Sequence, residues 1–145
     1  MPGTAEGVPA FEELTARGIS VNVTLLFSVG RYKEIVQAYI KGLERCAAAG
    51  RPVDKIASVA SFFVSRVDSQ VDSALEAHSN QDAAKALTGR VAIANAKVAY
   101  SYYRNIFASP QFSALAAKVL FHNGCYGLQP ALKTPLSVMS TTWRN

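Results

Sequence analysis

Two runs of mostly apolar residues, rich in β-branched and aromatic side chains, constrain the fold of this chain more than any other feature. They span residues 20–27 and 56–64, and their length and composition predict two β-strands. A short helix, with proline and acidic residues near its N-terminal end, is predicted between Pro9 and Gly18. Between the two strands, apolar side chains recur at helical spacing, and these are Ile35, Val36, Tyr39, Ile40, Leu43 and Ala47. Gly50 is expected to end this second helix.

The order helix, strand, helix, strand, with short connections, is typical of parallel βα units, so we predict an α/β fold. Because both strands are almost continuously apolar, we expect both faces of the sheet to be covered. The chain has 145 residues, whereas a closed eight-stranded α/β barrel needs about 200 residues at least. The sequence therefore predicts one domain at most and excludes a complete barrel.

The second half of the chain is predicted to be helical at first and then irregular. We expect one helix from Asp68, which would cap it, to His78, and another from Asp82 to about residue 107 with a break near Gly89. A further short helix is expected over 110–118. Residues 119–145 contain two glycines, two prolines and no acid, and they lack sustained periodicity, so we predict an irregular tail there.

Charge and cysteine content limit the classes of partner. The net charge of +5 comes from 15 Lys and Arg against 10 Asp and Glu, and it is spread along the chain, which argues against nucleic acid as a partner. The two cysteines, Cys46 and Cys125, match neither a disulfide framework nor metal-ligand spacing. The sequence has no membrane-spanning run and no signal peptide, so we expect a cytoplasmic protein without a membrane partner.

Polar residues interrupt the two strands in a pattern that suggests a binding site. Asn22 and Thr24 alternate in the first strand and therefore project to one face. In the second strand Ser61 and Phe63 share a face near the carboxyl end, and Arg66 follows just beyond it. Ligand sites of α/β barrels lie at the carboxyl ends of the strands, so these residues are candidates for one site.

A local explanation of the same residues is also open. Asn22 and Thr24 would then satisfy nearby backbone groups, Ser61 would be a small packing residue, and Arg66 would pair with Asp68 or Asp72. Spacing alone favours this explanation, because polar residues are common at strand ends.

Three motifs resemble the transaldolase family. The run Gly18-Ile-Ser-Val-Asn-Val-Thr-Leu-Leu-Phe-Ser28 is similar to the family's fifth barrel strand, where the pattern Asn-x-Thr-Leu-Leu-Phe-Ser lines the active site. The run Ser61-Phe-Phe-Val-Ser-Arg66 resembles its sixth-strand motif, Ser-x-Phe-Val-x-Arg. Pro2-Gly-Thr4, followed by Gly7, resembles the end of Lys-x-Pro-Gly-Thr-x-x-Gly. The resemblance, to transaldolases of the bacterial and cyanobacterial type, covers residues 1–118 and implies a partial, incomplete TIM (β/α)8 barrel containing about strands five and six with their helices.

This resemblance implies the function and the roles of the candidate residues. Transaldolases transfer a dihydroxyacetone unit between sugar phosphates in the non-oxidative pentose phosphate pathway, through a lysine Schiff base and without a metal or organic cofactor. Asn22 would contact the intermediate near the imine carbon, and Thr24 would position the catalytic water. Ser61 and Arg66 would bind the substrate phosphate, and Phe63 would shape the pocket.

The resemblance also implies that the catalytic lysine belongs one position before Met1, and that earlier strands supply the acid and base carboxylates. Lys55 lies at the amino end of the second strand, and the helical lysines are expected on solvated surfaces; these are Lys33, Lys41, Lys85 and Lys97. We therefore expect the isolated chain to be inactive. Two alternatives stay open: a non-catalytic module that binds sugar phosphates through Ser61 and Arg66, and a pseudogene product without function. Unpaired barrel edges would favour self-association.

The tail departs from the family pattern in a specific way. The family continues with a seventh strand that reads roughly Gln-Arg-x-Leu-Trp-Ala-Ser and then Thr-Lys-Asn-Pro. Codons for residues 122–129, read from the third base, permit Gln-Arg-Leu-Leu-Trp-Ala-Ser, and codons for 130–135 permit Gly-Thr-Lys-Asn-Pro. Codons for 138–144 permit Asp-Val-Asn-Tyr-Val-Glu-Glu in the same frame. We therefore predict that residues 119–145 are a tail translated in a shifted reading frame.

Overall fold

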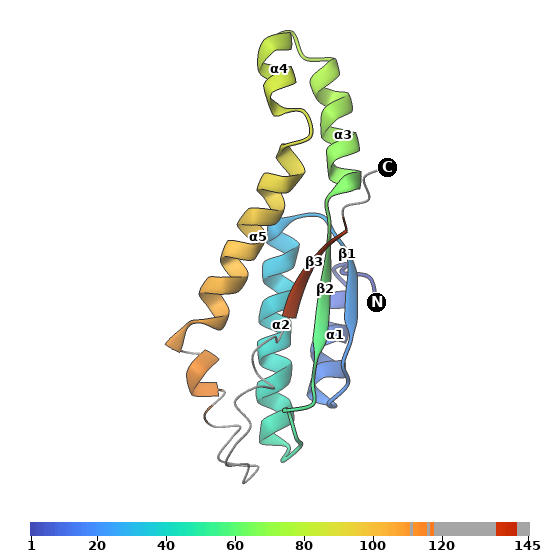
Figure 1. Ribbon diagram of the computed structural model, residues 1–145. Helices are drawn as coiled ribbons and strands as arrows, with labels where there is room; N and C mark the ends of the chain where they lie inside the picture. The colour runs from blue at the N-terminus through green and yellow to red at the C-terminus, as the bar shows by residue number, and fades with distance from the viewer. Residues whose placement is uncertain (111, 116, 118–135, 142–145) are drawn as a thin grey trace.

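A computed structural model describes residues 1–110, 112–115, 117 and 136–141. Its helices and strands follow one another in the order that Figure 1 shows. They are α1 (Gly7–Ala16), β1 (Asn22–Leu26), α2 (Val29–Ala48), β2 (Ser58–Phe63), α3 (Ser65–Glu76), α4 (Gln81–Leu87), α5 (Val91–Phe107) and β3 (Leu136–Thr141). The predicted order of helices and strands up to residue 107 is confirmed.

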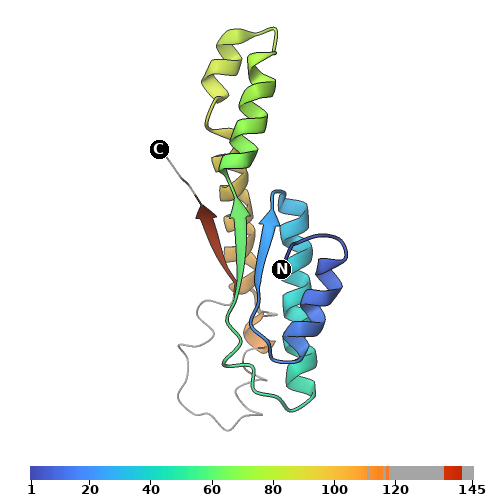
Figure 2. The ribbon, with the colours of Figure 1, turned by 90° about the vertical axis from the view of Figure 1, so that its right-hand side faces the viewer.

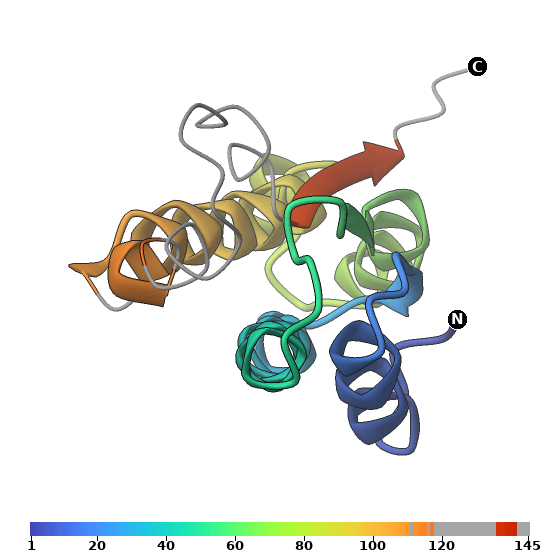
Figure 3. The same cartoon turned by 90° about the horizontal axis from the view of Figure 1, so that it is seen from below.

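The three strands form one parallel sheet in the order β1-β2-β3. Asn22 pairs with Val59, and Ala60 pairs with Val138. Figures 2 and 3 show the strands side by side, with α1 and α2 on one side of the sheet. The parallel βα arrangement is confirmed, and the sheet formed by the described residues is open rather than closed into a barrel.

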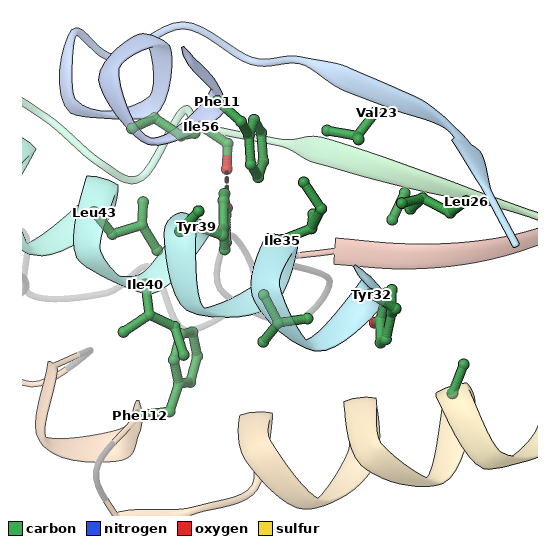
Figure 4. Close-up of a cluster of buried hydrophobic side chains, with 14 of the residues drawn as sticks. Phe11, Val23, Leu26, Tyr32, Ile35, Tyr39, Ile40, Leu43, Ile56 and Phe112 are labelled. Atoms are coloured by element: carbon green, nitrogen blue, oxygen red, sulfur yellow. Dashed lines mark hydrogen bonds between the residues drawn. The ribbon is translucent and has the colours of Figure 1, made fainter. Parts of the chain in front are cut away.

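The core lies between this sheet and α2. Val23 and Leu26 of β1 and Ala60 and Phe62 of β2 are fully buried against the helices. The apolar stripe of α2 meets them, as Figure 4 shows, and its buried members include Tyr32, Ile35, Val36, Tyr39, Ile40 and Leu43. Burying one large apolar side chain contributes about 1.5–3 kcal/mol, so this layer stabilises the fold substantially, and the predicted helical stripe is confirmed.

The expectation that both faces of the sheet are covered is wrong for the described residues. In β2 buried and half-buried side chains alternate, and in β1 Asn22 and Leu25 are exposed. The reason is that the helices packed on the sheet bury only one of its faces. We call the other side the open face, and it carries Asn22, Thr24, Ser61 and Phe63.

The helix ends confirm one prediction and correct two others. Gly89, with a φ of +69°, separates α4 from α5, as expected of a residue that adopts the left-handed region. Asp68, however, does not cap its own helix: α3 begins at Ser65, and the Asp68 carboxylate accepts a hydrogen bond from the backbone N–H of Ala92 at the start of α5. The acidic residues of α1 likewise lie beyond its first turn. Both of them, Glu12 and Glu13, accept hydrogen bonds from the Arg45 guanidinium at 3.0 and 2.7 Å.

The C-terminal region differs in part from the irregular tail that the sequence predicts. Leu136–Thr141 form β3 along the edge of β2, and the β-branched residues Val138 and Thr141 favour this extended backbone. Described residues of the short helix expected over 110–118 are helical. Residues 118–135 and 142–145 lie outside the described part, and so do Cys125 and most of the segment predicted to be frameshifted. Among the described helices, none is both long and apolar enough to cross a bilayer.

Candidate functional site

Thr24 joins β1 to the first residues of the chain. The backbone N–H of Thr24 donates to the carbonyl of Met1 at 2.8 Å, and the N–H of Gly3 donates to the carbonyl of Thr24 at 2.8 Å. Pro2 and Thr24 form a parallel bridge, so residues 1–3 extend the sheet beyond β1. The Thr24 hydroxyl also donates to the Met1 carbonyl, at 3.3 Å. The motif Pro2-Gly-Thr4 thus lies directly beside the strand that carries Asn22 and Thr24.

Asn22 and Ser61 are in direct contact across the open face. The Ser61 hydroxyl donates to Asn22 Oδ1 at 3.0 Å, linking β1 to β2. Ser61 is therefore more than a small packing residue. Because the amide oxygen accepts this bond, the two Nδ2 hydrogens of Asn22 remain as donors at an exposed position.

Phe63 and Arg66 form a second contact at the carboxyl end of β2. The Arg66 guanidinium carbon lies 5.5 Å from the centroid of the Phe63 ring, which is the geometry of a cation–π interaction. Phe63 also packs on Phe27, with ring centroids 5.4 Å apart. The three side chains therefore form a continuous series of contacts next to the end of the sheet.

The alternative in which Arg66 pairs with Asp68 or Asp72 is wrong. Both carboxylates are used elsewhere: Asp68 accepts from the N–H of Ala92, and Asp72 accepts from the N–H of Gly89 at 3.0 Å. Arg66 is exposed and forms no ion pair with any residue that the structure describes.

A β-bulge in β1 decides which residues reach the open face. Val23 pairs with Ala60 and Leu26 pairs with Phe62, so three steps along β1 match two along β2. Leu25, inside the bulge, has a φ of +59° and is the one non-glycine residue of the described chain with positive φ. The bulge shifts the alternation of side chains between the two faces of the sheet by one residue. As a result, both Val23 and Leu26 face the helices although they are three residues apart.

Phe27 lies within the family motif of the first strand, but the hydrophobic pattern does not indicate that its ring contacts Phe63. Strict alternation would place Val23, Leu25 and Phe27 on one face, whereas the bulge brings the Phe27 ring to Phe63 on the open face. The run Leu25-Leu26-Phe27 is uniformly apolar, so its hydrophobic pattern holds no signal for the shift.

The open face has little charge of its own. The strands β1 and β2 contain no carboxylate and no lysine. Each lysine considered above as a substitute nucleophile is exposed, and Lys55 precedes the amino end of β2 as predicted. A Schiff-base lysine needs a desolvated or electropositive surrounding to react at neutral pH, and none of these exposed positions supplies burial.

Comparisons with known proteins agree with the motifs. The family model described as Transaldolase/Fructose-6-phosphate aldolase matches residues 1–135. The transaldolase of Saccharopolyspora erythraea is 51% identical over 118 residues, which are 81% of this chain and 31% of that protein. The transaldolase of Frankia alni is 52% identical over 118 residues, covering 81% of this chain and 32% of the relative. Transaldolase 1 of Streptomyces avermitilis is 53% identical over 116 residues, which are 80% of this chain and 30% of that protein. The chain thus spans about a third of the length of the curated relatives it matches.

Proposed function

The chain belongs to the transaldolase/fructose-6-phosphate aldolase family, and from this premise we propose that it carries part of a transaldolase active site. The reaction is the transfer of a dihydroxyacetone unit between sugar phosphates in the non-oxidative pentose phosphate pathway. The observation that carries the proposal is the hydrogen bond between Ser61 and Asn22 on the open face. It joins one residue from each of two separate family motifs, at the face where a parallel α/β barrel has its interior.

Asn22 and Thr24 supply the polar groups near the reacting carbon. With Oδ1 of Asn22 held by Ser61, the amide Nδ2 is directed by a fixed partner and donates to the substrate or its imine intermediate. The Thr24 hydroxyl, half-buried two residues further along β1, holds the water that relays protons. Neither step needs a metal or an organic cofactor.

Arg66 and Ser61 bind the substrate phosphate. The Arg66 guanidinium is exposed and is not neutralised by Asp68 or Asp72, so its planar set of donors is available for phosphate oxygens. Phe63 lies between these two residues in sequence and forms an apolar wall of the pocket under the guanidinium.

The nucleophilic lysine belongs to the position before Met1 in the family motif. Pro2 pairs with Thr24 in parallel, and paired residues of a sheet project to the same side. Two residues earlier, a lysine would share the face of Asn22 and Thr24. We therefore propose that β1 and β2 are strands five and six of a (β/α)8 barrel, and that residues 1–145 alone are catalytically inactive.

Trapping with sodium borohydride in the presence of fructose 6-phosphate tests inactivity. We expect no covalent adduct by mass spectrometry on the 145-residue chain. A second chain with Lys added directly before Met1 is expected to form an adduct on that lysine, and a chain with Gln there is the matched control. An adduct on any lysine of residues 1–145 would contradict the proposal.

Ligand binding tests the phosphate role separately. Fructose 6-phosphate is expected to raise the thermal unfolding midpoint of the unmodified chain and of Arg104→Ala, which removes an exposed arginine from α5. The same ligand should leave Arg66→Ala unshifted. Equal shifts in both variants would show that Arg66 does not hold the phosphate.

A second candidate function is a non-catalytic module that binds sugar phosphates. The free Arg66 guanidinium, together with the exposed positions of the lysines considered, favours it. Binding that depends on Arg66, combined with no adduct on the lysine-extended chain, would support this module over a transaldolase site. A chain without a cooperative unfolding transition would instead support a non-functional product.

A further inference from the structure

We propose that Phe27 is a positioning residue that fixes the Arg66 guanidinium for anion binding by supporting the Phe63 ring beneath it. This inference rests on the phosphate role of Arg66 proposed above. It concerns a motif residue that is not among the candidate site residues Asn22, Thr24, Ser61, Phe63 and Arg66, and it connects the bulge in β1 with the site.

The contacts link three side chains in series. The Phe27 and Phe63 rings lie 5.4 Å apart between centroids with an interplanar angle of 37°, and the Arg66 guanidinium carbon lies 5.5 Å from the Phe63 centroid. Phe27 is 38% exposed, so its ring is not buried in the core and its main described aromatic contact is Phe63. Phe27 therefore stabilises the position of Phe63 rather than the helix–sheet core.

Two features of the backbone hold Phe27 in this place. The first is the bulge at Leu25, whose positive φ shifts the alternation and places Phe27 on the side of Phe63. The second comes from α5: the side-chain Nδ2 of Asn95 donates to the carbonyl oxygen of Phe27 at 2.9 Å. An uncommon backbone conformation such as that of Leu25 persists only where the surrounding structure enforces it. Burial of Leu26 against the helices and the hydrogen bond from Asn95 provide that enforcement on the C-terminal side of the bulge.

Support of this kind matters because Arg66 lies in the first turn of α3 and is exposed. A free arginine side chain samples many rotamers, and ordering it on a ligand lowers affinity. A guanidinium already lying on the Phe63 ring has lost part of that freedom before the anion arrives. Removing the Phe27 ring should therefore weaken anion binding without removing any group that touches the anion.

The test measures Arg66 directly and phosphate binding in parallel, on the full 145-residue chain. The variants are Phe27→Leu, which keeps an apolar side chain, although a smaller one, and removes the ring, and Phe27→Tyr, which keeps the ring. Tyr100→Leu is the matched control, because Tyr100 is 51% exposed and stacks on another aromatic ring on α5. The first readout is the ¹⁵N order parameter of Arg66 Nε, and the second is the Kd for inorganic phosphate, titrated against chloride at equal ionic strength.

We expect Phe27→Leu to lower the Arg66 order parameter below about 0.6, the range of flexible groups. It should also weaken phosphate binding by about two- to tenfold, which corresponds to the contribution of one aromatic pair. Phe27→Tyr and Tyr100→Leu should match the unmodified chain in both readouts. We expect Phe27→Leu and Tyr100→Leu to have equal thermal unfolding midpoints. A lower midpoint of Phe27→Leu would instead indicate a global loss of packing.

The outcomes separate this inference from the proposed function. An Arg66 guanidinium that is already flexible in the unmodified chain, or unaffected by Phe27→Leu, overturns the positioning role. If phosphate binds and Arg66→Ala abolishes binding while Phe27→Leu leaves the Kd unchanged, the positioning role alone is wrong. If Arg66 loses order in Phe27→Leu but phosphate binds neither chain, the positioning role stands and the phosphate role of Arg66 is wrong.

Discussion

The same substitution at two buried tyrosines of α2 should have opposite effects on stability. Tyr32 and Tyr39 lie two helical turns apart, and their exposed fractions are 0% and 1%. The Tyr39 hydroxyl donates to the backbone carbonyl of Ile56 at 3.1 Å in the buried core (Figure 4), which ties α2 to the segment before β2. The Tyr32 hydroxyl is buried without a hydrogen-bond partner in the part of the chain that the structure describes.

The size of each stability change follows from whether the buried polar atoms keep or lose a hydrogen-bond partner. Tyr39→Phe leaves the Ile56 carbonyl without its partner, and a buried acceptor left unsatisfied costs about 1–3 kcal/mol. Tyr32→Phe removes a hydroxyl that is desolvated with no compensating bond, a burial that costs about 1–3 kcal/mol in protein mutational data. The first variant should therefore lose at least about 1 kcal/mol and the second should gain about as much.

Urea and thermal unfolding followed by circular dichroism provide the measurement. For a chain of this size, 1 kcal/mol corresponds to about 2–4 °C in the unfolding midpoint, so the two variants should differ by at least about 4 °C. Both variants remove a single oxygen from a buried ring, so the loss of volume cancels in the comparison. Equal destabilisation by Tyr32→Phe and Tyr39→Phe would refute the reasoning, because it would mean that the two hydroxyls are equally well bonded.

Three further predictions concern helix packing, alkaline stability and the reading frame. Gly42→Ala should destabilise the chain in urea unfolding, because a Cβ there would lie 2.6 Å from a side-chain carbon of α1. Gly30→Ala, in the first turn of α2 where a Cβ would meet nothing within 4 Å, should instead raise the free energy of unfolding by up to about 1 kcal/mol. A gain in stability at both positions would refute close packing of α1 on α2. Burial raises the pKa of Tyr32 and Tyr39 above the ordinary value, so both stay protonated in the fold, and their titration does not change stability below about pH 10, where unfolded tyrosine titrates. The free energy of unfolding should fall as the pH rises further, with a smaller fall in Tyr32→Phe, and an equal pH dependence in Tyr32→Phe and the unmodified chain would contradict this. Resequencing the gene around the Lys118 codon should reveal an insertion or deletion, and an intact frame with no family-like sequence in the alternative frame would reject the shifted tail.

Much of this arrangement can be predicted from the sequence. Helical periodicity identifies the buried stripe of α2, including Ile35 and Tyr39, and a positive-φ glycine ends a helix where Gly89 stands. Alternation places Asn22 and Thr24 together, because side chains two apart in a strand share a face. These features depend on neighbours along the chain, which the sequence contains directly.

Other features were decided only by tertiary structure. Asp68 has the character of a cap for its own helix, yet its carboxylate receives the N–H of Ala92, since α5 packs close to α3 and offers an unpaired donor at its first turn. This pairing, across residues distant in sequence, also explains why Asp68 leaves Arg66 free. No local pattern specifies which helix end a carboxylate will meet.

The bulge at Leu25 shows the same limit most clearly. The sequence by itself determined a parallel βα arrangement and the polar face with Asn22, because hydrophobic spacing and glycine positions encode them. It did not determine that Phe27 reaches Phe63. In a run of apolar residues, either set of alternate side chains can face the helices, so the hydrophobic pattern does not decide on which face Phe27 lies. The choice was made by packing, since Val23 and Leu26 both bury against α2 only if one extra residue is inserted between them.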